Sequence, residues 1–389
     1  MKPRHIVLIN VVFFGFMVFS AGMVYQFMTG KKPLSFAGAL SHRDSTVTTT
    51  NCSSQPALSL SNASAQGLHK LEVYQQACHS FVTGTMMVFV GMPVSQATAL
   101  HAAEQDAAML KQFAHYGVRP LVTAEPTDYT TGVNIDFGQF AAGKFTIWLN
   151  VYFQSLKAAG ITDQQMGIWN PFPEANLPYW ANNQPQFFAP DVNIYVSTLH
   201  KYFPKAPASI MLNSATYQTT DFNWQSGEYD SLLPYIKGIT PGSIAYAGLE
   251  GFPWVSPAGG TGPIINAAEF LDSALIGEAA DYLGTKNVWL NTGTFSKKYA
   301  LDPTQLATVP PQQRKEILST IDQQALILQK QGYRVAVNLF SQDKSKASEE
   351  TDWSYWSGKQ PFSSLDTPVL TDFISELNQQ KIDFWLFDN

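Results

Sequence analysis

Eight short apolar runs, separated by longer helix-favouring segments, follow one another from residue 85 to the end of this 389-residue chain. Runs this short, bounded by polar or turn-forming residues, are typical of strands that are buried on both faces, as in a parallel sheet. The runs are Thr85–Gly91, Val118–Ala124, Met166–Asn170, Ala208–Ser214, Ser243–Leu249, Asn287–Thr292, Tyr333–Phe340 and Ile382–Phe387. The helix-favouring segments between them are roughly 95–116, 139–160, 188–204, 227–238, 266–284, 311–331 and 368–381.

The number of these strand–helix units predicts a closed barrel. Eight units match the (β/α)₈ TIM barrel, which has a single domain of ~250 residues or more. An open sheet that binds a dinucleotide would carry a G-x-G-x-x-G turn after its first strand, and no such turn follows residue 91. The predicted fold class is therefore α/β, with a (β/α)₈ TIM barrel over residues 69–389.

The first 30 residues have the pattern of a membrane anchor. Lys2, Arg4 and His5 precede residues 6–29, which carry no charged side chain. That length is enough to span the ~30 Å core of a bilayer, whereas the apolar part of a cleavable signal usually has ~7–15 residues. Residues 1–30 are therefore predicted to be a transmembrane signal anchor, with cleavage after residues 20–22 as the alternative. The soluble part is expected in the periplasm or outside the cell.

Residues 31–68 are rich in Ser, Thr, Ala and Asn, which indicates a linker that holds the barrel away from the membrane. The two cysteines of the chain, Cys52 and Cys78, precede the first predicted strand. In an exported protein they either form one disulfide or remain two unrelated thiols.

Charge and composition exclude some partners. The formal net charge is -6 and no basic run is longer than two residues, as in Lys31-Lys32, so nucleic acid is not a predicted partner. No cluster of Cys and His has the spacing of metal ligands, so neither a metal nor a cofactor is predicted.

Polar and aromatic side chains follow the predicted strands where each strand ends. In a (β/α)₈ barrel these ends meet on one face, which is where the chemistry takes place. Carboxylates that transfer protons, amides that bind hydroxyls and aromatic rings that stack on sugars are the combination found in sugar clefts. The residues are Glu125, Asn170, Glu174, Asn176, Asn213, Glu250, Phe252, Trp254, Asn291, Thr292, Asn338, Gln342 and Asp343.

One stretch, MGIWNPFPEANLPYW over residues 166–180, concentrates these residue types. Its three prolines deny it helix and ladder hydrogen bonds, so a rigid loop is predicted after the strand. Glu174 is the predicted acid and Asn176 a predicted hydroxyl ligand. The aromatic residues of the stretch are expected to surround a sugar ring: Trp169, Tyr179 and Trp180.

The order of motifs from about residue 85 to 356 resembles glycoside hydrolase family 26, a mannanase-like family of retaining (β/α)₈ glycosidases. The resemblance implies Glu174 as general acid/base, and Trp254 and Trp353 as sugar-stacking platforms. The stretches that carry the resemblance are Thr123-Ala124-Glu125-Pro126, Asn170–Leu177, Gly248–Trp254 and Asp352-Trp353.

The chain departs from the family at the nucleophile. The family has a Glu-x-Gly motif at the end of its seventh strand, and the matching stretch here begins with Asn291. The histidine and arginine of the acid/base motif are replaced by Pro173 and Asn170, and the tyrosine that supports the nucleophile is Phe252. The resemblance thus implies that an amide stands where the nucleophile is expected.

The strand count also differs from the family pattern, in which the acid/base follows strand four. We expect that residues 132–137 form a short additional strand and that Ile382–Phe387 lies outside the count of eight. The alternative is that the chain resembles family 26 less closely than the order of its motifs suggests.

The second carboxyl that glycoside hydrolysis requires has two candidates, Glu250 and Glu125. Glu250 is the better one because it directly follows a strand. Two functions remain open. The first is an anchored glycoside hydrolase acting on a β-linked polysaccharide such as mannan. The alternative is an inactive polysaccharide-binding relative that assists exopolysaccharide synthesis or export.

Overall fold

The computed structural model describes residues 85–177, 180–220, 223–228, 230–253, 266–293, 311–341 and 367–388. The predicted anchor and linker, both cysteines, Tyr179, Trp254 and Trp353 lie outside these residues. Among the described residues, no helix is both long and apolar enough to cross a membrane.

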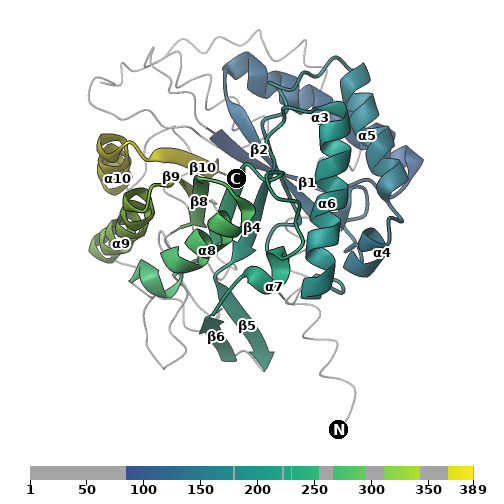
Figure 1. Ribbon diagram of the computed structural model, residues 1–389. Helices are drawn as coiled ribbons and strands as arrows, with labels where there is room; N and C mark the ends of the chain where they lie inside the picture. The colour runs from purple at the N-terminus through teal and green to yellow at the C-terminus, as the bar shows by residue number, and fades with distance from the viewer. Residues whose placement is uncertain are drawn as a thin grey trace, which may run out of the picture.

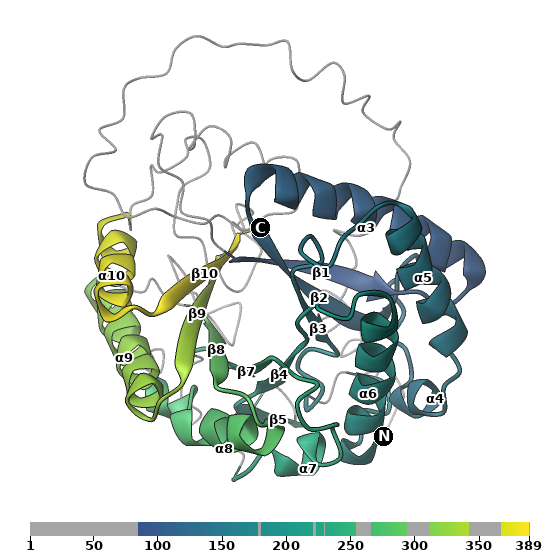
Figure 2. The same ribbon diagram turned by 45° about the horizontal axis from the view of Figure 1, so that its top comes forward.

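Eight parallel strands form one sheet that closes into a barrel (Figure 2). The strand order is β3-β2-β1-β10-β9-β8-β7-β4, and neighbouring strands are hydrogen-bonded. The two ends of this order meet through the bridge between Trp169 and Ala208, where the Trp169 amide donates to the Pro207 carbonyl over 2.9 Å. The strands are β1 (Thr85–Met92), β2 (Arg119–Asp128), β3 (Ile168–Pro171), β4 (Ser209–Asn213), β7 (Tyr246–Glu250), β8 (Asn287–Thr292), β9 (Arg334–Ser341) and β10 (Asp383–Asp388).

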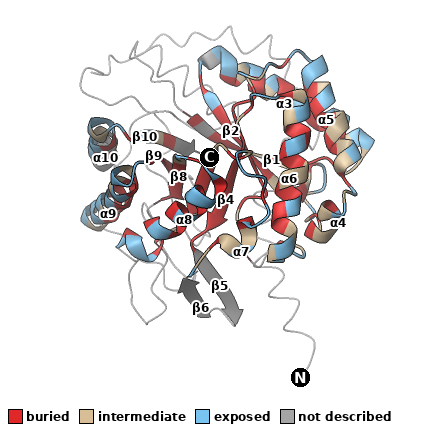
Figure 3. Cartoon of the chain, viewed as in Figure 1, coloured by how far each residue is buried: buried red, intermediate tan, exposed pale blue. Residues whose placement is uncertain are grey.

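Helices surround the barrel, and the strands lie between them and the barrel interior (Figures 1 and 3). The helices alternate with the strands along the chain, as predicted from the apolar runs, so the α/β barrel is confirmed. They are α3 (Gln96–Tyr116), α4 (Phe137–Ala141), α5 (Thr146–Ala158), α6 (Pro185–Tyr202), α7 (Leu233–Ile236), the 3₁₀ helix η3 (Ala267–Glu269), α8 (Ser273–Leu283), α9 (Pro311–Lys330) and α10 (Thr367–Gln380).

All eight predicted runs are barrel strands, but the expected strand over residues 132–137 is wrong. Within that stretch Asn134 makes one antiparallel bridge to Thr127, and Phe137 begins α4. Ile135 is buried and its amide donates to the Pro126 carbonyl, so the stretch folds back as a loop after β2. The last run is β10, which pairs with β1 and β9 and is needed to close the barrel. Glu174 therefore follows the third barrel strand, and Asn291 lies on the sixth.

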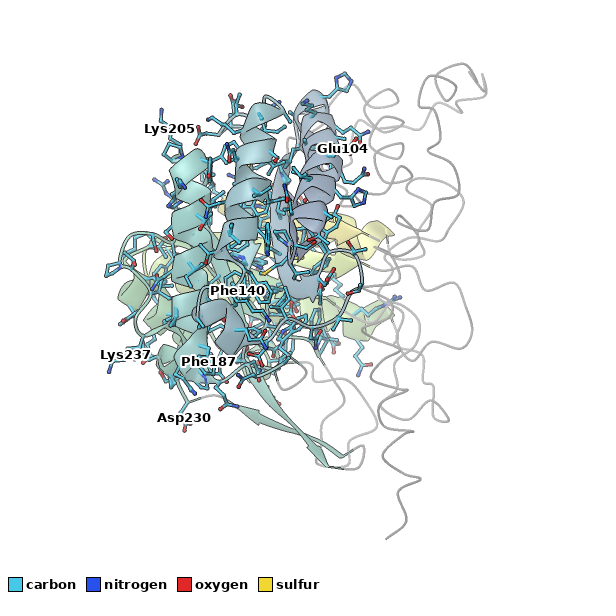
Figure 4. The ribbon with its side chains drawn as sticks, turned by 90° about the vertical axis from the view of Figure 1, so that its right-hand side faces the viewer. Glu104, Phe140, Phe187, Lys205, Asp230 and Lys237 are labelled. Carbon is cyan, nitrogen blue, oxygen red and sulfur yellow. The ribbon has the colours of Figure 1, made fainter. Side chains whose placement is uncertain are left out.

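The predicted helix over residues 227–238 is also largely wrong. Only α7 lies there, and an antiparallel hairpin of β5 (Ala215–Thr220) and β6 (Asn223–Glu228) precedes it. The hairpin begins two residues after β4 ends, so it extends the carboxyl end of the barrel. Figure 4 shows Phe140 and Phe187 towards the end of the molecule from which this hairpin projects, and Lys205 towards the opposite end.

The barrel interior is filled in layers. Its lower layer is apolar, because the inward residues of the strands form one buried cluster of Met87, Leu121, Ile168, Met211, Trp289, Ala336 and Trp385. Gly248 makes room for the Trp289 ring, since a Cβ at this glycine would lie 2.4 Å from the indole. The Trp289 indole N–H donates to the Ser209 hydroxyl over 2.8 Å, which satisfies its one polar group.

Candidate active site

Polar residues form the layer above this apolar cluster, towards the carboxyl ends of the strands. Side chains alternate between the two faces of a strand, so a residue two positions beyond an inward residue also points inward. Asn170, Asn213, Asn291 and Asn338 each follow an inward residue of the apolar cluster by two positions and are at most 1% exposed. Glu250 completes the layer from the end of β7 and is 5% exposed.

Glu174 enters this layer from the loop after β3. The loop is held from both sides, because the Phe172 amide donates to the Ala124 carbonyl over 3.0 Å and the Glu174 amide donates to the Met211 carbonyl over 2.9 Å. Phe172 and Glu174 adopt positive φ angles of 54° and 50°. Non-glycine residues rarely adopt this conformation, and it tends to occur at functional sites. The predicted loop after the strand is present, and these hydrogen bonds fix its position.

The carboxyls of Glu174 and Glu250 are hydrogen-bonded neighbours. The side-chain amide of Asn213 connects them, donating to Glu174 Oε1 over 3.1 Å and lying 3.5 Å from Glu250 Oε1. Two carboxyls in such contact cannot both be ionised at low cost, so at neutral pH the pair holds a proton. Glu250 is buried, whereas Glu174 is partly exposed. One carboxyl of the pair therefore reaches solvent and the other lies beneath it.

Amides hold Glu250 in place. Asn291 Nδ2 donates to Glu250 Oε2, and Asn338 Nδ2 in turn donates to Asn291 Oδ1 over 2.5 Å. Burial and the neighbouring Glu174 carboxyl raise the pKa of Glu250 well above its ordinary value, while the hydrogen bonds from Asn291 and Asn213 act in the opposite direction. Asn291 thus supports a carboxylate. Asn213 and Asn338 were predicted from the sequence as polar residues at strand ends, but their contacts with the carboxyl pair and with Asn291 were not.

Glu125 brings a third carboxyl to the same place. It is half-buried on β2, one residue beyond the Ala124 that pairs with Pro171 of β3. Desolvation, and then the nearby Glu174 carboxyl, raise the pKa of Glu125 to about 8. The structure therefore brings together the three glutamates that the sequence analysis selected.

Two of the predicted aromatic residues lie in the protein core and do not line the site. Trp169 is fully buried on the outer face of β3, where it contacts Phe153 of α5, and its indole donates to the Met166 carbonyl over 2.9 Å. Trp180 is 7% exposed, and its indole donates to the Pro173 carbonyl over 3.0 Å. The expectation that these rings surround a sugar is corrected accordingly.

Asn176 is bonded to the protein backbone. Its Nδ2 donates to the Asn213 carbonyl over 2.7 Å, and its Oδ1 accepts from the Asn213 amide over 2.9 Å. It is buried, so it fastens the loop that carries Glu174 to the end of β4. A contact between this amide and a sugar hydroxyl would require these bonds to break.

Gly251 allows the chain to turn directly after Glu250. A Cβ at this position would lie 1.5 Å from the backbone oxygen of Phe270 and 2.6 Å from the Ser214 hydroxyl. The hydroxyl of Ser214 donates to that same carbonyl, and its amide donates to the Glu250 carbonyl over 2.7 Å. Close packing of backbone on backbone therefore fixes the position of Glu250.

Replacing Gly251 by alanine is expected to destabilise the fold by about 3 kcal/mol or more, because a backbone atom cannot move aside as a side chain can. Urea unfolding followed by circular dichroism measures the loss. Gly277→Ala in α8 is the control, since the nearest atom to its Cβ would be 3.6 Å away and alanine favours helix by up to about 1 kcal/mol. Equal stability of Gly251→Ala and the wild type would contradict this packing.

Among the described residues, no group of three or more His, Cys, Asp or Glu side chains is arranged to hold a metal ion. The arrangement of Glu125, Glu174 and Glu250 suits chemistry in which carboxyls exchange protons or attack a carbon atom.

Comparison with known proteins supports the fold. No family model and no curated protein matches the sequence. The β-glucosidase from Thermotoga maritima in complex with glucoimidazole is a similar solved structure, with a TM-score of 0.52 and 10% identity over 80% of this chain and 87% of that one. The virulence factor SghA from Agrobacterium tumefaciens is similar with a TM-score of 0.51 and 10% identity over 80% of this chain and 86% of that one. At such low identity, the likeness shows that the barrel has the fold of these proteins.

Proposed function

We propose that this protein is a glycoside hydrolase that cleaves a β-linked polysaccharide with Glu174 and Glu250. The observation that carries the proposal is the hydrogen-bonded pair of carboxyls, one buried and one partly exposed, at the carboxyl end of a (β/α)₈ barrel. Glycoside hydrolysis requires two such carboxyls on either side of the scissile bond. The similar solved structures include β-glucosidases, which gives further support to this reaction class.

The proximity of the pair favours retention of configuration. Inverting enzymes separate their carboxyls by ~6.5–9.5 Å to admit a water molecule, whereas retaining enzymes place them ~5–5.5 Å apart. Carboxyls in hydrogen-bonding contact leave no place for that water. In the proposed reaction Glu174 donates its proton to the departing oxygen, and Glu250 attacks the anomeric carbon. Water then releases the sugar, with Glu174 acting as base.

The amides around the pair suit this division of roles. Asn213 and Asn291 donate to Glu250, which favours its ionised form and opposes the rise in its pKa that burial and the Glu174 carboxyl cause. Glu174 is partly exposed, as an acid that meets a leaving group must be. Among the residues proposed for binding, Asn170 and Glu125 line the same end of the barrel. Tyr179, Trp254 and Trp353 are proposed from the sequence alone.

Membership of family 26 and membrane anchoring through residues 1–30 belong to the proposal, as does a location in the periplasm or outside the cell. These features rest on the sequence pattern. The family resemblance makes mannan one of the β-linked polysaccharides to test. Residues 31–68 are the proposed linker and residues 69–389 the proposed catalytic domain.

Binding without hydrolysis is the second candidate function. It is favoured by the amide of Asn291 on the sixth strand, where the resembled family has the carboxylate of its nucleophile. Incubation of the full chain with β-mannan, β-glucan and mixed exopolysaccharides separates the two functions. Release of reducing ends supports the hydrolase. Retention of a polysaccharide on the protein with no release of reducing ends would identify the binding protein.

A further inference from the structure

The site gathers three carboxyls from three separate elements. Glu125 comes from β2, Glu174 from the loop after β3 and Glu250 from the end of β7. Glu174 is close enough to influence both of the others electrostatically. Hydrolysis needs two of these groups, so the third is unexplained by the proposed reaction.

Within the described part of the chain, no cation shifts the pKa of Glu125 or Glu250. The groups that affect the ionisation of Glu125 and Glu250 are other carboxyls and amides, with no Lys, Arg or His among them. Arg119 is at the start of β2, at the opposite end of the barrel. There its guanidinium donates to the Thr85 hydroxyl over 2.9 and 3.0 Å and lies over the rings of Tyr246 and Trp385.

Unpartnered polar atoms lie in the same layer. Both Asn170 Oδ1 and Asn170 Nδ2 lack a hydrogen-bond partner although Asn170 is fully buried, and so does the hydroxyl of Thr123. These residues are register partners on β3 and β2, and Glu125 follows Thr123 on the same inward face. Asn338 Oδ1 across the barrel is also unpartnered. Leaving a buried polar group without a partner costs ~1–3 kcal/mol, so such groups indicate a missing polar ligand.

The ligand that meets these conditions carries positive charge and several N–H donors. A primary ammonium group has three donors and no acceptor, and it complements both the carboxyls and the unpartnered amide oxygens. It also fits on a sugar ring in place of a hydroxyl. Resting on the proposed function, we infer that the site takes a β-linked glycan with free amino groups, of the glucosamine class, and that Glu125 recognises the ammonium.

The test measures binding and cleavage of three β-1,4-linked tetramers by the full chain at pH 6. The tetramers are those of glucosamine, N-acetylglucosamine and glucose, which differ in the substituent at carbon 2. The glucosamine tetramer is expected to bind about tenfold or more tightly than either neutral one, because a bound ammonium lowers the pKa of Glu125 from about 8 and forms with its carboxylate a charge pair that is weakly screened in a partly buried site. Added salt is expected to reduce this preference.

Glu125→Gln is expected to reduce the preference for the glucosamine tetramer to a few-fold difference in Kd from the neutral tetramers. Glu104→Gln is the matched control. Glu104 is exposed on α3 (Figure 4), so its replacement makes the same change in net charge away from the site. Equal or tighter binding of a neutral tetramer, binding of none of the three, or an unchanged preference in Glu125→Gln would overturn the inference.

The same measurements separate this inference from the proposed function. Cleavage of the glucose tetramer without preference for glucosamine would refute the inference and leave the hydrolase standing. Preferential binding of the glucosamine tetramer without cleavage of any tetramer would support the inference and refute the hydrolase.

Discussion

Glu250→Gln is expected to lower kcat/KM by roughly 10⁴-fold or more, as removal of a nucleophile does in other enzymes that form covalent intermediates. Glutamine keeps the shape of the side chain and can still accept from Asn213, but its amide cannot attack the anomeric carbon. The rate of reducing-end release from the best substrate of the wild-type enzyme measures the effect.

Two comparisons establish the cause of that loss. Thermal unfolding is expected to show Glu250→Gln at least as stable as the wild type, because the replacement removes a buried carboxyl whose ionisation is opposed by burial and by Glu174. Glu269→Gln in η3 alters an exposed carboxylate and should leave kcat/KM unchanged. Activity in Glu250→Gln within tenfold of the wild type would show that Glu250 is not the nucleophile.

Glu174→Gln is expected to have an effect that depends on the leaving group. A general acid contributes roughly 10²–10⁴-fold, and this contribution is needed only when the departing oxygen must be protonated. Polysaccharide cleavage should therefore fall by that factor. For a β-glycoside with a dinitrophenolate leaving group, the rate of the first, bond-breaking step should fall little in Glu174→Gln.

The pH profile provides the second part of the Glu174 prediction. The wild-type pair works with one shared proton, so activity falls at high pH when that proton leaves and at low pH when a second one binds. Glu174→Gln leaves a single carboxyl in the pair, so no proton is shared and none has to be retained at high pH. With the dinitrophenyl substrate the alkaline limb should vanish in this variant and the acidic limb should remain. Equal losses on both substrates, with an unchanged profile, would assign Glu174 a purely structural role.

The barrel could be predicted from the sequence because its strands are buried on both faces. A strand with helices outside and a packed interior inside must be short and largely apolar, so each of the eight strands appeared as a mostly apolar run. The segment over residues 132–137 looks similar because Ile135 and Phe137 are apolar. These side chains pack into the outer core, with the Phe137 ring 5.3 Å from that of Phe172. Sequence alone does not show whether such a segment pairs with a barrel strand.

The carboxyls of the site could be located because each lies at the end of an apolar run. The rule of alternating faces would also have corrected one error, since an inward Asn170 requires Trp169 to point outward. The roles of Asn176 and Asn213 could not be predicted. Both are amides at the edge of the same cleft, and only the fold shows that Asn176 bonds to backbone whereas Asn213 bridges two carboxyls.

The most direct test of the proposed pair is to trap its intermediate. The full chain would be incubated with the 5-fluoro-β-glycosyl fluorides of glucose, mannose and glucosamine, in which the anomeric fluoride is a good leaving group and the 5-fluorine slows release of the sugar from the enzyme. Mass spectrometry of the digested protein is expected to find one sugar attached to Glu250, in the wild type and also in Glu174→Gln, because fluoride departs without help from a general acid. A sugar attached to another residue, or turnover of these fluorides without any attached sugar, would contradict the assignment of Glu250 as nucleophile.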